Sequence, residues 1–233
     1  MTIGAISAYC RAHLDLAQAI LTDQAYSYYS LPLCVIDAVF SIGVRYSSTE
    51  ATVRRFCDYF HLQLSRAAQV PAREEQLSIA EFLRINREYG TERMADEIYR
   101  NRQRTSTKGG ILKAEAAALF AQALADYGVD HFQDASNIQE NFEFEAAIKE
   151  IPGQHSGVSL RYFYMLAGDT NFIKPDRMVK RFLYSATGEQ LSDDECQRVL
   201  AETCAMLAKD YPNLTPRSLD NLIWKYQRNA GRD

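Results

Sequence analysis

Apolar side chains recur at spacings of three and four residues along nearly the whole chain of 233 residues. This spacing places them on one face of an α-helix. Segments of alternating β-branched and polar residues bounded by hairpin turns are missing. The sequence therefore predicts an all-α protein. One stripe, expected to face a core and to end at Gly128, consists of Leu112, Ala116, Leu119, Phe120, Ala123 and Tyr127.

Two helices have clear start signals. Ser192-Asp-Asp-Glu195 has the pattern of a capping box and predicts a helix running to about Lys209. Thr215-Pro216 provides an N-cap and a first-turn proline for a last helix through Trp224. Further helices are expected near 3–22, 31–43, 49–65, 76–86, 91–99 and 139–150.

The longest apolar run, Leu31 to Val44, is interrupted by Asp37 and is too short to span a bilayer, so it is expected to be a buried helix. Arg11 and His13 interrupt any apolar stretch of a signal peptide, and we expect a cytoplasmic protein. The cysteines form no CxxC pair and are expected to be reduced, buried thiols: Cys10, Cys34, Cys57, Cys196 and Cys204.

Charge is unevenly distributed along the chain. The net charge of -4 argues against a non-specific nucleic-acid binder. Residues 130–150, however, hold six acids against Lys149, whereas 98–113 holds five bases and no acid. The segment 98–113 is therefore either a basic face on an acidic protein or an ordinary solvated surface. Its bases are Arg100, Arg102, Arg104, Lys108 and Lys113.

The most informative segment is 150–183. An acidic helix is followed by a tight turn at Pro152-Gly153 and by a second helix that is expected to stop at Gly168. Free backbone N–H groups near Ser156 and Gly157, at the beginning of the second helix, favour a phosphate anion. A hairpin of this kind can bind a DNA backbone without distinguishing its sequence.

Another helix is expected soon after this hairpin. Pro175 suits its first position and Asp176 its first turn, where the helix dipole favours an ionised carboxylate. The alternative interpretation of Asp176 is an ordinary helix cap.

Ile151-Pro152-Gly153, followed by Lys174-Pro175-Asp176 and Val179, resembles the helix-hairpin-helix DNA glycosylase superfamily in order and spacing. Its members carry an L-P-G-x-G hairpin, a helix and a Pro/Val-Asp element. Upstream, 32–60 looks like the early helix and wedge loop of the family, and 104–129 looks like its basic turn and following helix.

The resemblance implies two helical lobes with a cleft between them. One lobe would combine 1–30 with 170–233. The other, 31–169, would be a helical barrel that ends in the helix-hairpin-helix at 139–168.

The resemblance also implies removal of a modified base from double-stranded DNA by a monomeric enzyme. Asp176 would be the catalytic carboxylate, which stabilises positive charge on the sugar and orients or deprotonates water. The flipped base needs a pocket or a wedge, for which the candidates are Asp37, Ser41, Arg45 and Tyr46. The candidates for binding the DNA backbone are Gly153, His155, Ser156, Gly157, Arg104 and Lys108.

Two departures from the family pattern matter. His155 replaces the second hairpin glycine and tolerates left-handed backbone less well, which could alter the phosphate contact. Gly157 occupies the place of the nucleophilic lysine of bifunctional members and cannot form a Schiff base, so a monofunctional enzyme is implied. The cysteine cluster of iron–sulfur members is missing. No cofactor is expected, other than a monovalent cation that the hairpin could hold.

The sequence leaves two alternatives for the target base. It is either a damaged base removed in repair or a hypermodified phage base, such as a modified cytosine, removed in antiviral defence. One alternative is a non-catalytic helix-hairpin-helix DNA-binding module, which His155 favours. A second alternative is a helical protein–protein adaptor.

Overall fold

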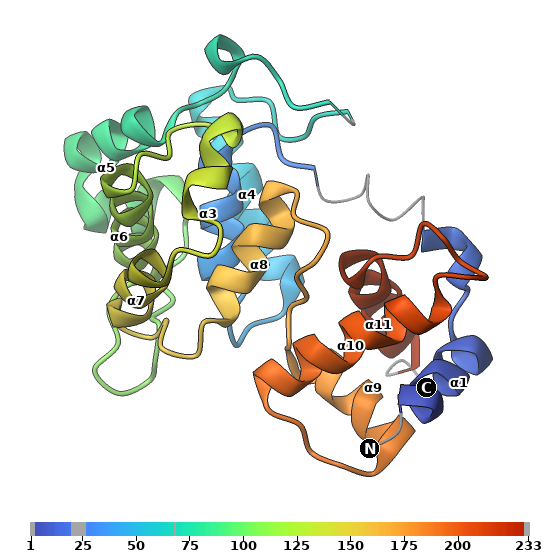
Figure 1. Ribbon diagram of the computed structural model, residues 1–233. Helices are drawn as coiled ribbons and strands as arrows, with labels where there is room; N and C mark the ends of the chain where they lie inside the picture. Colours follow the sequence, from blue (N-terminus) through green and yellow to red (C-terminus); the bar gives the residue numbers. More distant parts are fainter. Residues whose placement is uncertain (1–2, 20–26, 68, 231–233) are drawn as a thin grey trace. The chain divides into compact units, whose positions relative to one another are not determined.

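A computed structural model describes residues 3–19, 27–67 and 69–230 (Figure 1). Within these residues all regular secondary structure is helical, and β pairing is limited to isolated bridges between Tyr28 and Ser65 and between Arg104 and Leu112. The all-α prediction is confirmed. The chain divides into two compact units, Met1–Tyr26 with Gly168–Asp233, and Ser27–Ala167.

The unit 27–167 is built around one apolar helix, α3 (Leu31–Phe40), in which every residue is buried. A helix that is apolar on all sides must be enclosed by others, and α3 packs against α4, α5, α6 and α8 (Figure 1). The other α-helices of this unit are α4 (Tyr46–Phe60), α5 (Ile79–Arg93), α6 (Lys113–Asp126), α7 (Phe142–Glu150), which packs on α6, and α8 (Val158–Ala167).

Short elements connect these helices. They are the 3-10 turns η3 (Arg73–Glu75) and η5 (Phe132–Ile138) and the π-helical turn η4 (Met94–Ile98). The predicted helices 76–86 and 91–99 are two helical segments separated by a kink at Gly90, which lies inside the bounds of α5 and has a non-helical backbone. The second segment runs directly into η4. Gly90 has φ 71°, a value that glycine adopts readily.

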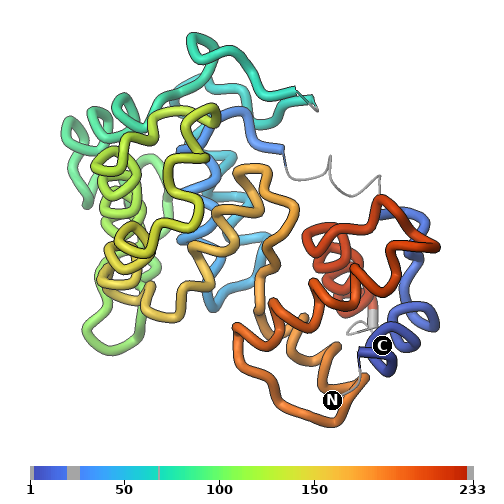
Figure 2. Tube along the Cα trace, viewed as in Figure 1, coloured from blue at the N-terminus to red at the C-terminus, as the bar shows by residue number. Residues whose placement is uncertain are grey.

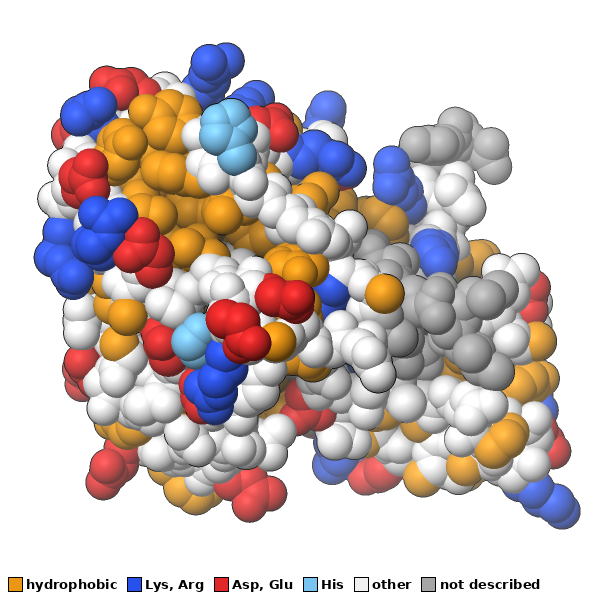
Figure 3. Space-filling view, turned by 90° about the horizontal axis from the view of Figure 1, so that it is seen from above, with side chains coloured by type: hydrophobic (Ala, Val, Ile, Leu, Met, Phe, Trp, Pro, Cys, Tyr) orange, Lys and Arg blue, Asp and Glu red, His pale blue; other side chains and the backbone are white. Residues whose placement is uncertain are grey.

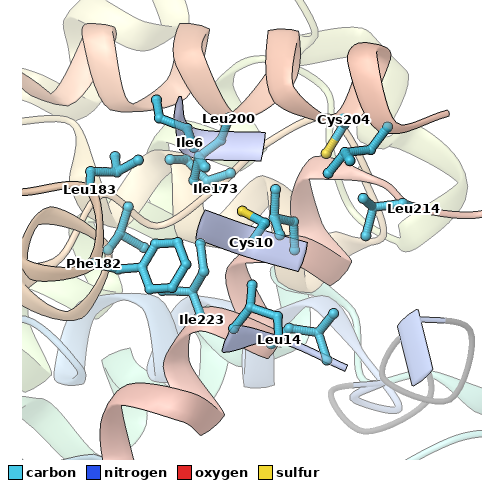
Figure 4. Close-up of a cluster of buried hydrophobic side chains, with 14 of the residues drawn as sticks. Ile6, Cys10, Leu14, Ile173, Phe182, Leu183, Leu200, Cys204, Leu214 and Ile223 are labelled. Atoms are coloured by element: carbon cyan, nitrogen blue, oxygen red, sulfur yellow. The ribbon is translucent and has the colours of Figure 1, made fainter. Parts of the chain in front are cut away.

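The second unit combines an N-terminal helix with the C-terminal helices, as the trace in Figure 2 shows. Helix α1 packs on α9 and α10, and α11 packs on α9 and α10. Ile6 and Cys10 of α1 meet Phe182 of α9, Leu200 of α10 and Ile223 of α11 in its core (Figure 4). Its elements are α1 (Ile3–His13), η1 (Leu16–Gln18), α9 (Arg177–Thr187), α10 (Asp193–Leu207) and α11 (Pro216–Ala230).

Both sequence signals for helix starts in this unit are confirmed. The Glu195 N–H donates to Ser192 Oγ at 3.3 Å, and the Ser192 N–H donates to Glu195 Oε2 at 2.8 Å, which is the reciprocal pattern of a capping box. Helix α11 begins at Pro216 and extends past Trp224 to Ala230.

Several predicted boundaries are wrong. Helix α1 ends at His13, because Asp15 has a non-helical backbone (φ -83°, ψ 81°); the predicted end at residue 22 lies outside the described residues. Helix α3 stops at Phe40, and α4 runs from residue 46 to 60 rather than from 49 to 65, since His61 takes φ 54°. Helix α7 begins at 142, three residues later than expected, after η5. Leu119 does not face the core and is 41% exposed.

The five cysteines are free and buried, as expected. Burial raises the pKa of the Cys10 thiol to about 12. No helix in the described part of the chain is long and apolar enough to cross a membrane.

Candidate functional site

Asp176 is the N-cap of α9. The prediction that Pro175 starts this helix is wrong: α9 begins at Arg177, and the Asp176 backbone is extended (φ -84°, ψ -177°). Its side chain explains the boundary. Asp176 Oδ1 accepts hydrogen bonds from the Met178 N–H at 2.7 Å and the Val179 N–H at 3.3 Å. The cap interpretation of Asp176 is therefore correct as far as Oδ1 is concerned.

The other carboxylate oxygen of Asp176 is uncommitted. Both capping bonds go to Oδ1, and within the described residues no donor contacts Oδ2. The side chain is half-buried. Two N–H donors at the positive end of a helix stabilise negative charge on the carboxylate. Asp176 can therefore cap α9 and still offer one oxygen to a ligand.

Asp220 on α11 lies beside this segment. It is buried, with 8% of its surface exposed, and its Oδ1 accepts a hydrogen bond from the Lys174 N–H at 3.2 Å. Burial, together with the negative charge of Asp176, raises the pKa of Asp220 well above its usual range. Burial and the neighbouring charge of Asp176 therefore both favour the uncharged form of the Asp220 carboxyl.

Two consecutive turns join α7 to α8. The Gln154 N–H donates to Ile151 O at 2.9 Å, and the Gly157 N–H donates to Gln154 O at 3.0 Å. Gly153 and Gly157 have φ values of 87° and 70°, whereas His155 is not among the residues with positive φ. The replacement of a family glycine by His155 therefore causes no left-handed strain at this position.

A second turn, 104–112, packs against this hairpin. The Thr105 N–H donates to Ile111 O at 2.9 Å, and Arg104 Nη1 donates to Gly110 O at 2.7 Å. A Cβ atom added at Gly153 would lie 2.4 Å from Thr105 Cβ, so the two turns are in direct contact. The structure thus brings together the predicted backbone-binding residues, of which Arg104, Lys108, His155 and Ser156 are exposed.

Two of the five expected basic residues are unavailable for phosphates. Lys113 is 3% exposed, and its Nζ donates to Phe40 O at 2.9 Å and Ile42 O at 2.7 Å. Arg102 forms ion pairs with Glu92 and Asp96, both at 2.7 Å. Of the two interpretations of 98–113, a basic face or an ordinary solvated surface, neither fits the buried Lys113, and Arg102 is paired with acids on the surface. On the face shown in Figure 3, basic and acidic side chains are interspersed.

Asp37 is enclosed by tyrosines. Its carboxylate is fully buried, and Oδ2 accepts hydrogen bonds from the Tyr28 hydroxyl at 2.8 Å and the Tyr162 hydroxyl at 3.3 Å. Burial raises the pKa of Tyr28, and the neighbouring Asp37, Tyr46 and Tyr162 raise it further. Two of the predicted pocket residues, Asp37 and Tyr46, therefore belong to one cluster, which we call the Asp37 cluster.

The other two pocket candidates lie on the segment between α3 and α4. Ser41 is the C-cap residue of α3, is buried, and donates from Oγ to Ala38 O at 3.2 Å. Arg45 is exposed and is the N-cap residue of α4. Lys113 Nζ holds the start of this segment through the carbonyl of Ile42.

No group of three or more metal-binding side chains occurs in the described ranges 3–19, 27–67 and 69–230. A family model described as a domain of unknown function, DUF8548, matches residues 4–228. The chain belongs to this family. The DUF8548 match extends over both compact units. Searches of curated proteins and of solved structures find no match to the chain.

In this DUF8548 chain the sequence analysis missed Asp220 as a neighbour of Asp176 in one unit, and Tyr28 and Tyr162 as partners of Asp37 in the other. An acid between Leu219 and Leu222, on the apolar face of a predicted helix, was the available signal for Asp220. The tyrosines carried no comparable signal, because they more often complete a core with their hydroxyl at a polar edge.

Proposed function

We propose that the protein is a monofunctional DNA N-glycosylase that excises a modified base and leaves an abasic site. The observation that carries this proposal is the state of Asp176. One carboxylate oxygen is fixed by two backbone N–H groups of α9, and the other is uncommitted on a half-buried side chain. A carboxylate fixed in this way suits a charged transition state, because it needs no reorganisation during the reaction.

The chemistry requires such a carboxylate. As the bond from C1′ to the base breaks, the base leaves with the electron pair and positive charge develops on the sugar. At about 4 Å and an effective dielectric constant near 20, a carboxylate stabilises that charge by on the order of 4 kcal/mol. This corresponds to about a thousandfold in rate. Asp176 Oδ2 can also accept a proton from the water whose oxygen bonds to C1′.

The two contacting turns support DNA binding. Arg104, Lys108, His155 and Ser156 are exposed on turns that touch through Gly153 and Thr105. Basic side chains and backbone N–H groups in this arrangement bind phosphates without distinguishing sequence. Gly157 offers no amine for a Schiff base, so strand cleavage by a lyase step is not proposed.

The Asp37 cluster supports a role in holding the extruded base. Asp37 is fully buried and therefore acts through its neighbours, orienting the hydroxyls of Tyr28 and Tyr162. Tyr46 is half-buried and belongs to the same cluster. Aromatic rings with fixed hydroxyls suit a flipped base, by stacking and by hydrogen bonds to its edge. The substrate is a damaged base or a hypermodified base such as a modified cytosine.

The test is base release by the wild type and by Asp176→Asn from alkylated bacterial DNA and from phage DNA with modified cytosines. Released bases are identified by mass spectrometry, and abasic sites are scored by alkaline cleavage. Asparagine keeps the cap, because its amide oxygen accepts the same N–H groups. We therefore expect Asp176→Asn to lose turnover, by about a thousandfold, while unfolding as the wild type does.

The matched control is Asp194→Asn, which removes an exposed carboxylate from the first turn of α10. It should release the base at the wild-type rate. Salt-sensitive DNA binding without base release from any DNA would refute the enzyme and favour a non-catalytic DNA-binding module. The absence of salt-dependent DNA binding would refute both the glycosylase and the non-catalytic DNA-binding module.

A further inference from the structure

Asp220 and Asp176 are joined through a single residue, Lys174. The Lys174 N–H donates to Asp220 Oδ1 at 3.2 Å, and the Lys174 carbonyl accepts the N–H of Asp176 at 2.6 Å. The segment that carries Asp176 is therefore bonded to α11 at one residue and capped onto α9 two residues later. A shift of Asp220 would move Lys174 and, with it, the backbone of Asp176.

The same segment is held at other points by uncharged groups. The Ile173 N–H donates to Gln197 Oε1 at 3.0 Å, and the Arg217 N–H donates to Thr170 O at 3.1 Å. Ile173 and Pro175 are buried. Of the three backbone hydrogen bonds named here, the one to Asp220 ends on a titratable side chain.

We infer that Asp220 is a positioning residue for Asp176: as a buried acceptor of the Lys174 N–H in the same unit, it fixes the Lys174–Asp176 segment. The inference rests on the proposed function, in which Asp176 is the carboxylate that faces the sugar. It assigns to this site a second carboxyl group that does not itself touch the substrate.

The charged groups that act on Asp220 are few. The negative charge of Asp176, at the start of α9, disfavours ionisation of Asp220, whereas the positive charge of Lys174, before α9, favours it. Burial has the largest effect and, with Asp176, raises the pKa of Asp220 well above the usual range for an aspartate. Removal of the Asp176 charge should therefore make Asp220 easier to ionise.

The first experiment follows the aspartate side chains of the full-length protein by carbon NMR with 13Cγ-labelled aspartate during a pH titration. Asp220 is assigned from the signal missing in Asp220→Asn. We expect this signal to titrate far above the other aspartates. In Asp176→Asn its midpoint should move down, because the charge that opposes its ionisation is gone. This measurement needs no DNA substrate.

The second experiment measures single-turnover base release, across pH, from whichever DNA of the panel the wild type acts on. Asp220→Asn keeps an uncharged acceptor for the Lys174 N–H and should stay within about threefold of the wild type at neutral pH. Asp220→Ala loses the acceptor and should be slowed on the order of 100-fold, the effect of a small misplacement of a reacting group. The wild-type rate should fall at high pH as Asp220 ionises, and Asp220→Asn should lack that fall.

Asn221→Ala is the matched control, because Asn221 is a neighbour on α11 that is buried to the same degree, 7% exposed against 8% for Asp220. Equal slowing by Asn221→Ala and Asp220→Ala would overturn the inference in favour of a general role in core packing. An Asp220 signal that ignores Asp176→Asn would also overturn it. If no DNA loses a base, the proposed function fails, and the NMR titration alone decides whether the two carboxyl groups act as a pair.

Discussion

Replacement of Gly153 by alanine tests the contact between the hairpin and the turn 104–112. The new Cβ atom would lie 2.4 Å from Thr105 Cβ and 2.9 Å from Thr105 Oγ1. Gly153 also has φ 87°, which an L-residue adopts only with strain. The substitution therefore combines a backbone penalty with a steric one.

The two penalties can be estimated separately. A left-handed backbone at a non-glycine residue costs about 1 to 2 kcal/mol. Forcing a methyl group into a packed contact costs about 1 to 3 kcal/mol more. We expect Gly153→Ala to lower the free energy of unfolding of the unit 27–167 by about 2 to 5 kcal/mol.

The control for strain alone is Gly109→Ala. Gly109 has φ 70°, and a Cβ atom there would meet nothing within 4 Å, so only about 1 to 2 kcal/mol should be lost. Unfolding is followed in denaturant by circular dichroism. Fluorescence of Trp224, the single tryptophan, reports separately on the other unit.

A double-mutant cycle isolates the steric part. Thr105→Gly removes Cβ and Oγ1, the two atoms nearest to the new methyl group, and leaves the backbone oxygen at 3.2 Å. Gly153→Ala should therefore cost less in that background, by about 1 to 3 kcal/mol. A coupling energy near zero, or equal losses in Gly153→Ala and Gly109→Ala, would refute the contact between the two turns.

Two further predictions concern buried charge and pH. Lys113→Met leaves two carbonyls at the end of α3 without their donor and should destabilise the protein by about 2 to 4 kcal/mol in chemical denaturation. The control is Lys149→Met, which removes a half-exposed lysine paired with Glu145 and should change the free energy of unfolding by less than about 0.5 kcal/mol. Equal effects of the two substitutions would contradict the role of Lys113. The Arg73 guanidinium, which donates to both carboxylate oxygens of Asp134, holds the pKa of this carboxyl at about 2. Because that pKa is lowered on folding, its contribution of about 1 to 2 kcal/mol is complete above the usual aspartate range and is lost as the pH falls through about 2. Stability measured from pH 6 to pH 2 should therefore fall more steeply in the wild type than in Asp134→Asn, and parallel curves would refute the assignment.

The sequence by itself determined the helical class, the central helix α3 and the caps of α10 and α11. These features depend on interactions between residues three or four positions apart, such as the reciprocal bonds of Ser192 and Glu195. The tight turn at Gly153 belongs to the same group, because its left-handed backbone is a local property of glycine. The sequence pattern predicted helix ends less well, because a single hydrogen bond can decide the boundary, as the cap at Asp176 shows.

The tertiary structure alone decided which of the candidate site residues lie together. It placed Asp220 beside the Lys174–Asp176 segment, enclosed Asp37 with Tyr28 and Tyr162, and brought Gly153 against Thr105. It also buried Lys113 under the end of α3 and left Leu119 exposed. Each of these outcomes joins residues far apart in the chain. Their physical cause is packing between elements, which helical periodicity constrains only to a face and not to a partner.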